Sequence, residues 1–267
     1  MAESSPLNPP GPLPITSLGS SHVPDAAHEL QVQDLHVDHG RICALAEVTF
    51  SIGCGHCVGV LGQNGAGKST LLKSIAGLLP AVKGHIHWRG LPLNKVRSEI
   101  AYLPQIDSID PYFPLTVEGM VDMGRYPHLG EHASWRTLDR EVVETALETL
   151  QLQDLRHRRL YQLSGGQRQR AQIARALAQE AHILLLDEPF SGLDEPSQRM
   201  LIKVLRDLAD NGRLLLVCHH DLKAVPEIFD TVLLLNRKPV GFGKTETAFT
   251  PENLKAAFDQ RPEDVHV

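Results

Sequence analysis

The chain alternates short apolar stretches with longer segments in which apolar residues recur at helical spacing. Apolar and polar residues alternate in the N-terminal third, which predicts two strands joined by a turn at His39-Gly40. Further along, short apolar runs predict buried strands, as is typical of parallel sheets. The predicted strands cover residues 30–37, 44–52, 58–61, 85–88, 100–103, 183–186, 214–218 and 232–235.

Helical periodicity separates many of these strands. Strands and helices that alternate with short connections favour a mostly parallel sheet covered on both faces, and hence an α/β fold. The stretch at residues 85–88 suggests a strand of a separate, antiparallel sheet. The predicted helices cover residues 117–123, 138–150, 166–178 and 201–208, and one more begins near Lys68.

The composition changes along the chain, which predicts its division into parts. Residues 1–27 are rich in proline and serine and predict a flexible or disordered tail without activity. Residues 28–104 and 164–267 carry the strands of the predicted α/β core. Between them, residues 105–163 begin with a proline-interrupted stretch and then become helical, which predicts an inserted helical subdomain.

With 267 residues, the chain is long enough for one large α/β domain with a subdomain. Its net charge of −6 argues against a protein that coats nucleic acid. The sequence has no apolar run of about 18 residues, and its N-terminus lacks the basic start and apolar stretch of a secretory signal. We therefore expect a cytosolic chain whose membrane role, if it has one, comes through partners.

The clearest chemical signal is a glycine-rich loop between a predicted strand and a predicted helix. Its spacing is G-x-x-x-x-G-K-[ST], in which the glycines let successive backbone N–H groups turn inward around an anion. The start of the helix adds free N–H groups and the positive end of its dipole. Lys68 can reach the β- and γ-phosphates of a nucleotide, and the Ser69 hydroxyl can ligate Mg²⁺. The loop consists of Gly62, Gln63, Asn64, Gly65, Ala66, Gly67, Lys68, Ser69 and Thr70.

Two carboxylates, Asp187 and Glu188, follow the apolar strand at residues 183–186. Ligands of open α/β sheets bind at the carboxyl ends of the strands. Asp187 is therefore suited to hold Mg²⁺, and Glu188 is suited to polarise an attacking water. Surface charge at a strand end is the simpler alternative, and the glycine loop favours the functional interpretation.

A second candidate anion-binding nest precedes the helix at residues 166–178. The sequence Ser164-Gly165-Gly166-Gln167 places a serine and two glycines at the helix start. One nucleotide does not need two such nests from one chain, so we expect this nest to close over the γ-phosphate of a nucleotide held by another copy. An ordinary serine N-cap is the alternative.

Together these motifs resemble the ATP-binding cassette (ABC) ATPases, and the resemblance covers about residues 30 to 258. The glycine loop matches Walker A, Asp187-Glu188 matches Walker B, and Leu163–Gln167 matches the signature motif. Three further matches appear in the family's order: Gln105 as the Q-loop glutamine, Ser191-Gly192-Leu193-Asp194 as the D-loop, and His220 as the switch histidine.

The resemblance implies a P-loop NTPase (RecA-like) core with an antiparallel β subdomain and an inserted α-helical subdomain. It also implies a homodimer, or pseudo-dimer, that sandwiches two ATP molecules with Mg²⁺. Glu188 would act as the general base, His220 would contact the γ-phosphate, and Gln105 would join Ser69 and Asp187 around Mg²⁺. The other subunit would contribute its signature motif and D-loop through Ser164, Gly165, Gly166, Gln167 and Asp194.

The adenine contact departs from the family's pattern. Such ATPases often stack adenine on an aromatic ring that precedes the first long strand of the core. The aligned residue here is His39. An imidazole can stack, though less strongly than a larger ring, so His39 is the expected adenine contact.

Two regions narrow the resemblance to importers of transition metals. Residues 109–117 with Met123–Gly130, and segments between Leu233 and Leu254, are similar to the manganese, zinc and iron importer ATPases. Siderophore, haem and cobalamin importer ATPases share the Gly-Arg-Tyr-Pro-His element at residues 124–128 and stay an alternative, as does a soluble ABC ATPase without transport. The resemblance implies separate permease subunits, an indirect extracytoplasmic metal-binding protein, no nucleic acid, and a place at the cytoplasmic face of the membrane.

The helical insert is expected to offer a groove to a short helix of the permease. Candidate lining residues are Phe113, Met120, Met123 and Tyr126. A methionine adapts well to such a surface, although a place in the core of the insert is the alternative. Exposed apolar residues on the insert would favour a transporter subunit, and a wholly polar face would favour the soluble ATPase.

Cys54-Gly55-His56-Cys57 has the spacing of a dithiol redox motif. It lies in a turn that leads into a strand, whereas a reactive thiolate is stabilised at a helix N-terminus. We therefore expect these cysteines to be inert. The 14 histidines are scattered along the chain, so we expect most of them to be solvated rather than metal ligands.

Overall fold

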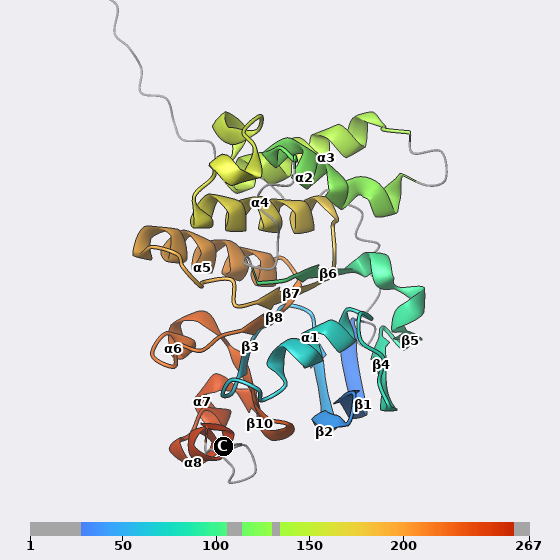
Figure 1. The fold of residues 1–267 in the computed structure, drawn as a ribbon, viewed down its shortest axis with the longest axis vertical. Helices are drawn as coiled ribbons and strands as arrows, with labels where there is room; N and C mark the ends of the chain where they lie inside the picture. Colours follow the sequence, from blue (N-terminus) through green and yellow to red (C-terminus); the bar gives the residue numbers. More distant parts are fainter. Residues whose placement is uncertain (1–27, 106–113, 130–133, 259–267) are drawn as a thin grey trace, which may run out of the picture.

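A computed structural model describes residues 28–105, 114–129 and 134–258 of the chain. The predicted tail over residues 1–27 and the candidate groove residue Phe113 lie outside these described residues. Figure 1 shows a central sheet, with one group of helices stacked beyond it at one end and a second, smaller sheet toward the other.

The central sheet has six strands in the order β10-β9-β3-β8-β7-β6. Five of these strands run parallel, and β10 pairs antiparallel with β9 at one edge. The continuous apolar runs form the inner strands because both faces of the sheet are covered. The strands are β3 (Cys57–Leu61), β6 (Ile100–Leu103), β7 (Ile183–Asp187), β8 (Leu214–Cys218), β9 (Thr231–Asn236) and β10 (Lys238–Lys244).

The second sheet is antiparallel and has four strands in the order β2-β1-β4-β5. Val32 of β1 pairs with Phe50 of β2 on one side and Ile86 of β4 on the other, and the alternating apolar residues face inward. The strands are β1 (Glu29–His39), β2 (Ile42–Gly53), β4 (Lys83–Trp88) and β5 (Leu91–Pro92). The predicted antiparallel sheet is therefore confirmed.

Each face of the central sheet has its own apolar core. Ile183 and Leu185 of β7 pack with α1 (Lys68–Ile75) and the antiparallel sheet, so that α1 lies between the two sheets. Leu184 and Leu186 point to the opposite core, to which α5 (Glu195–Asp210) also contributes. Full burial of such a leucine contributes roughly 1.5–3 kcal/mol to the free energy of folding. The core that contains Leu71, Leu72 and Ile75 fixes α1, and with it the glycine loop, against the sheet.

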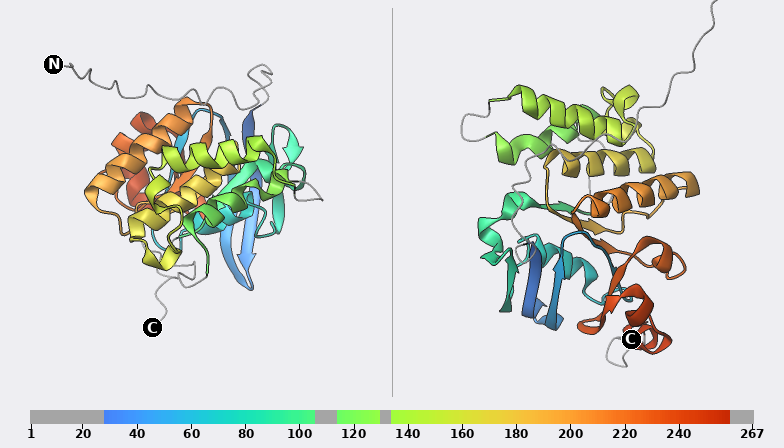
Figure 2. Two further views of the ribbon diagram at one scale, coloured as in Figure 1. Left: turned by 90° about the horizontal axis from the view of Figure 1, so that it is seen from above. Right: turned by 180° about the vertical axis from the view of Figure 1, so that it is seen from behind.

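The helical end of the molecule is built around α4 (Gly165–Ala178), which packs against both α2 (Val117–Asp122) and α3 (Thr137–Thr149). The same helix also contacts β6 of the central sheet. Figure 2 shows this stack of helices from above and from behind. Helix α4 thus connects the helical end with the core.

The segment η5 (Met123–His128) joins this stack through backbone contact and a buried cation. A Cβ atom on Gly124 would lie 2.3 Å from the carbonyl oxygen of Arg175, so only glycine allows this approach to α4. Arg125 is 1% exposed and donates hydrogen bonds to Asp139 on α3 and to the Ala178 carbonyl oxygen at the end of α4. A buried guanidinium needs such partners to offset its desolvation.

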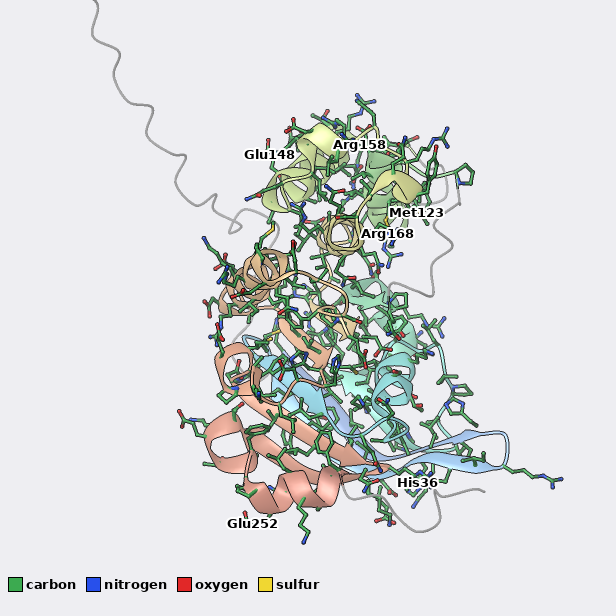
Figure 3. The ribbon with its side chains drawn as sticks, turned by 60° about the vertical axis from the view of Figure 1, so that its left-hand side comes forward. His36, Met123, Glu148, Arg158, Arg168 and Glu252 are labelled. Carbon is green, nitrogen blue, oxygen red and sulfur yellow. The ribbon has the colours of Figure 1, made fainter. Side chains whose placement is uncertain are left out.

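All predicted strands are confirmed, and the helices differ mainly in their bounds. The helix predicted at 201–208 begins earlier, at Glu195, because Asp194 caps it. The proposal of Met120 as a groove residue is wrong: its side chain is 4% exposed and belongs to the core. Met123 and Tyr126 are 39% and 60% exposed, and Figure 3 shows Met123 at the helical end.

Several short elements were not anticipated from the sequence. They are β5, β10, η2 (Leu93–Lys95), η3 (Arg97–Glu99), η5, η6 (Gln153–Leu155), η7 (Leu160–Gln162), α6 (Val225–Ile228), α7 (Thr245–Ala248) and α8 (Pro251–Phe258). Glycine and proline interrupt β10, so its sequence lacks the alternation that would predict a strand. Within the described ranges, no helix combines the length and apolar character needed to cross a membrane.

Candidate active site

The predicted site residues gather at one edge of the central sheet. Strands β3, β6, β7 and β8 run parallel, so their carboxyl ends lie at the same edge. Gly62 follows β3, Gln105 lies two residues beyond β6, Asp187 ends β7, and His220 lies two residues beyond β8. This edge is where ligands bind in open α/β sheets.

The glycine loop requires glycine because the backbone packs closely around it. A Cβ atom on Gly62 would lie 2.2 Å from the carbonyl oxygen of Leu235. Gly67 has a φ of 96°, and a Cβ atom there would lie 2.4 Å from Leu45 Cδ2. Other residues would therefore both clash and adopt an unfavourable backbone conformation.

Lys68 begins α1 and lies against the loop. Its side chain is largely buried, at 7% exposed, and its Nζ atom donates to the carbonyl oxygens of Gly62 at 2.8 Å and Gln63 at 2.9 Å. The ammonium group and the positive end of the α1 dipole therefore act on the same small region. This combination is suited to bind phosphate groups.

Ser69, the next residue, links the glycine loop to the end of β7, which lies two strands away from β3 in the central sheet. Ser69 Oγ donates to Asp187 Oδ1 at 3.0 Å, and the Tyr102 hydroxyl donates to Asp187 Oδ2 at 3.3 Å. Hydroxyl and carboxylate oxygens are the hard ligands that Mg²⁺ prefers, and Mg²⁺ commonly uses only one or two protein ligands besides substrate phosphates. The donor set at Ser69 and Asp187 therefore fits Mg²⁺.

Glu188 lies between two other predicted site residues. Gln105 Nε2 donates to Glu188 Oε2 at 3.5 Å, and His220 Nδ1 lies 3.8 Å from the same oxygen. Glu188 has a φ of 50°, a left-handed conformation that costs a non-glycine residue about 1–3 kcal/mol. The surrounding structure maintains this strain, and the carboxylate is thereby placed beside Gln105 and His220.

A buried histidine next to His220 was missed in the sequence, where most histidines were expected to be solvated. His219 is 5% exposed and packs edge-on against Phe190 and Phe229. Burial lowers the pKa of His219 to about 4, with a smaller contribution from His220, so the ring is neutral near pH 7. Its only signal in the sequence is the adjacent histidine pair. The ring anchors the segment that carries His220.

His39, the expected adenine contact, lies near the glycine loop. Its Nε2 atom is 3.1 Å from the Oγ1 atom of Thr70 on α1. The side chain is exposed at the end of β1. Its contact with adenine stays a prediction.

The second nest is formed by the start of α4. The Ser164 hydroxyl accepts a hydrogen bond from the Gln167 backbone N–H at 3.3 Å, and the Gln167 side chain accepts one from the Ser164 N–H at 3.0 Å. This capping box confirms that Ser164 is an N-cap. Both hydrogen bonds stay within the helix start, and among the described residues no hydrogen bond joins Ser164 or Gln167 to the glycine loop.

The D-loop lies beside this nest. A Cβ atom on Gly166 would lie 3.2 Å from the Oγ atom of Ser197, in the first turn of α5. Asp194 caps that helix by accepting a hydrogen bond from the Ser197 N–H at 3.0 Å, and this bonding holds the pKa of Asp194 below its usual value. The signature motif and the D-loop therefore form one continuous surface.

Cys54 and Cys57 lie where burial keeps their thiols protonated and therefore unreactive. Burial raises the pKa of Cys54 to about 11 and that of Cys57 to about 12, so both thiols are neutral near pH 7. Cys57 is 2% exposed at the start of β3. Among the described residues, no group of three or more His, Cys, Asp or Glu side chains could hold a metal ion.

Comparisons with known proteins agree on one family. The model of the ABC transporter family matches residues 45–191 of the chain. The manganese transport system ATP-binding protein MntB of Listeria innocua is 42% identical over 233 residues, which cover 87% of this chain and 97% of the relative. The zinc transport system ATP-binding protein TroB of Treponema pallidum is 40% identical and covers 88% of each chain.

Solved structures give the same fold. A structure described as an inward-facing metal-chelate type ABC transporter is 35% identical to this chain, has a TM-score of 0.75, and covers 86% of this chain and 88% of the other. The ATP-binding cassette MJ1267 in its ADP conformation has a TM-score of 0.70 and covers 85% of this chain and 93% of the other. At 24% identity, this second likeness supports the fold alone.

Proposed function

This chain belongs to the ABC transporter family of ATP-binding subunits, which hydrolyse ATP, and we propose that it drives an importer of a transition-metal ion. The proposed cargo is manganese, zinc or iron, carried through separate permease subunits. The observation that carries the ATP-driven part of the proposal is a cluster of site residues at one sheet edge beside the glycine loop, namely Ser69, Asp187, Glu188, Gln105 and His220.

The loop and its lysine bind the phosphates of ATP in this proposal. Backbone N–H groups of the loop and the Lys68 ammonium neutralise the β- and γ-phosphates. The Glu188 carboxylate accepts a proton from the attacking water, whose oxygen then bonds to the γ-phosphorus. The bond between that phosphorus and the oxygen of the ADP leaving group breaks. Gln105 and His220, which both lie against Glu188, orient the water and the γ-phosphate.

Mg²⁺ is the proposed cofactor of this reaction. Ser69 Oγ and Asp187 Oδ1 would hold the ion, with Gln105 joining its shell. When bound, the ion neutralises charge on the β- and γ-phosphate oxygens. The Asp187 carboxylate, at the end of β7, already faces the glycine loop, because Ser69 Oγ donates to its Oδ1 atom at 3.0 Å.

The second nest implies a dimer. Ser164, Gly165, Gly166 and Gln167 would contact the γ-phosphate bound by a second copy, and Asp194 would face the interface. The start of α4 is at least partly exposed, so such a phosphate can approach the helix N-terminus. Two nucleotides would be enclosed when two copies close.

The permease would dock at the helical end. Met123 and Tyr126 expose apolar surface on η5, which favours a transporter subunit over a soluble ATPase. Docking there would hold the chain at the cytoplasmic face of the membrane. Movement of the two helical ends on dimer closure would then drive the permease.

The proposed cargo follows the curated relatives, whose names specify manganese or zinc transport. One observation favours a second candidate, namely import of a metal chelate: the structural neighbour at 35% identity is described as metal-chelate type. In both cases an extracytoplasmic binding protein would deliver the cargo to the permease, and this chain would never contact the cargo.

The test is purification of the tagged chain from detergent-solubilised membranes of its own cells, with identification of the proteins that accompany it. We expect a polytopic permease, and we expect Tyr126→Ala to reduce its recovery. Leu138→Ala is a matched control, because Leu138 is an exposed apolar residue on α3 at 46% exposure. Recovery of only soluble proteins would contradict the transport role.

Cargo is tested by uptake in cells that lack the chain. Loss of radiolabelled manganese, zinc or iron uptake as free ions would support the metal-ion proposal. Loss of uptake of a metal chelate alone would favour the second candidate. A catalytically inactive Glu188→Gln chain should fail to restore uptake, which ties transport to hydrolysis.

A further inference from the structure

Tyr102 contacts two functional parts of the molecule at once. It lies on β6, which pairs with β7. Its side chain is half-buried on the face of the sheet that carries α1. Its hydroxyl donates to Asp187 Oδ2 at 3.3 Å. Its backbone carbonyl oxygen accepts a hydrogen bond from Arg175 Nη2 at 3.1 Å. Arg175 belongs to α4, whose first turn is the second nest.

The Tyr102 hydroxyl donates to the carboxylate oxygen of Asp187 that Ser69 does not contact. Ser69 contacts Oδ1 and Tyr102 contacts Oδ2, so the two donors share the carboxylate. A phenol keeps its proton near pH 7, so the Tyr102 hydroxyl is a donor to the Asp187 carboxylate. The Cys218 thiol also faces Asp187, but a thiol is a weak donor.

Arg175 is half-buried and directs its guanidinium toward a backbone group. Its guanidinium is desolvated, and burial lowers its pKa. In the described part of the chain it takes part in no ion pair, and its hydrogen bond goes instead to the backbone of Tyr102. Its own carbonyl oxygen lies where only a glycine, Gly124, permits the contact with η5. The hydrogen bond from Arg175 and the one from Gln179 Nε2, at the end of α4, to the Ile100 carbonyl oxygen both help to set the position of β6 relative to α4.

We propose that Tyr102 is a positioning residue, which orients Asp187 for the nucleotide-bound Mg²⁺ and ties that carboxylate to helix α4. This inference rests on the proposed Mg-ATP site and adds a residue that no motif of the sequence includes. Groups that hydrogen-bond to metal-binding carboxylates orient them, and their loss commonly costs about 10-fold to 100-fold in metal affinity or activity.

The first test compares the purified full chain with its Tyr102→Phe variant, which keeps the ring and removes only the hydroxyl. ATP affinity is measured by calorimetric titration, once in Mg²⁺ and once in EDTA. In EDTA, we expect the variant to bind ATP as tightly as the wild type. As Mg²⁺ is added, ATP affinity rises, and we expect the variant to need about tenfold more Mg²⁺ to reach half of that rise. Tyr161→Phe, which removes a hydroxyl on the half-exposed ring of η7, is the matched control and should behave as the wild type.

Two outcomes of this test would overturn the inference. Tyr102→Phe could show the same Mg²⁺ dependence as the wild type, which means that the hydroxyl does not orient Asp187. ATP affinity could instead fall equally with and without Mg²⁺, which means that the hydroxyl supports only the fold. Wild-type protein that binds no ATP would overturn the proposed function, and this inference with it, so the two failures are distinguishable.

The second test concerns the link to α4. Arg175→Gln removes the guanidinium that contacts the Tyr102 backbone, and we expect it to raise the Mg²⁺ requirement as well. The effects of Arg175→Gln and Tyr102→Phe should be less than additive in a double-mutant cycle, because both act on one carboxylate. Arg175→Lys, which keeps a donor, should recover part of the affinity and serves where the Gln variant folds poorly. Full additivity would overturn the link.

Discussion

The glycine loop at residues 62–67 and the helix start at Ser164–Gln167 are both groups of backbone N–H donors, but they are built differently. In the loop, Gly65 and Gly67 have φ values of 82° and 96°, and a side chain on Gly67 would clash with Leu45. In the helix start, neither glycine has a positive φ, and a capping box completes the turn. The first nest depends on conformations that other residues avoid, whereas the second is an ordinary helix N-terminus.

The surroundings of the two nests differ in the same way. Lys68, Asp187 and Glu188 lie around the loop, so that one chain provides the cation, the metal ligand and the base. Around the helix start, the neighbours are the D-loop and the first turn of α5. The first nest is thus suited to bind a nucleotide alone, and the second is suited to act on a nucleotide that another copy holds.

The largest effect is expected at the first nest. Lys68→Ala removes the ammonium group from the loop, and we expect ATP affinity to fall by about 100-fold or more, with hydrolysis lost. Binding is measured by titration of the isolated chain with ATP. Lys73→Ala, in the last turn of the same helix, is the control and should bind normally. Normal ATP affinity in Lys68→Ala would contradict the role of the loop.

Glu188→Gln should separate binding from hydrolysis. A glutamine cannot accept the proton of the attacking water, so we expect the rate of hydrolysis to fall by about 100-fold to 10,000-fold. ATP should still bind, and because it is not consumed, two copies should stay closed around it. Size-exclusion chromatography with light scattering in saturating Mg-ATP measures the dimer. A variant that stays monomeric under these conditions would contradict the sandwich.

The sequence predicted the first nest better than it predicted the contacts of the catalytic groups. The apolar runs and the motifs that follow them placed the site residues at strand ends, because the carboxyl ends of parallel strands meet at one edge. The hydrogen bond between Tyr102 and Asp187 joins residues 85 positions apart, and it depends on which strands become neighbours. The left-handed φ of Glu188 and the burial of His219 depend likewise on tertiary packing.

The helical end shows the same limit of sequence patterns. Met120 and Met123 lie three positions apart, which is one turn of a helix and would place them on one face. Helix α2 ends at Asp122, however, and η5 continues with a different periodicity, so Met120 is buried and Met123 is exposed. A helix boundary thus decides which methionine can meet a partner.

At the second nest we expect two smaller effects, one on stability and one on hydrolysis. Ser164→Ala removes an N-cap, which costs about 1 kcal/mol in the free energy of unfolding. ATP affinity of the isolated chain should be unchanged, but hydrolysis should fall by about tenfold or more because the dimer loses a contact with the γ-phosphate. Chemical denaturation and steady-state hydrolysis measure the two effects separately.

Thr116→Ala is the matched control for this variant. Thr116 caps α2 by accepting a hydrogen bond from the Gly119 N–H at 3.1 Å, and it lies outside both nests. We expect a similar loss of stability without a loss of hydrolysis. If the two variants lowered hydrolysis equally, Ser164 would be only an N-cap, and the proposed role of the second nest would be wrong.

The smallest effect is expected at the cysteine pair before the first nest. Cys54→Ser with Cys57→Ser should leave hydrolysis nearly intact, because both thiols are protonated near pH 7 and contact no catalytic group. The buried Cys57 should account for any loss of stability, since its serine hydroxyl would need a hydrogen-bond partner inside β3. Hydrolysis is measured with and without a reductant. A large loss of activity, or a dependence on the reductant that the double variant abolishes, would mean that the first nest is under redox control from the strand that leads into it.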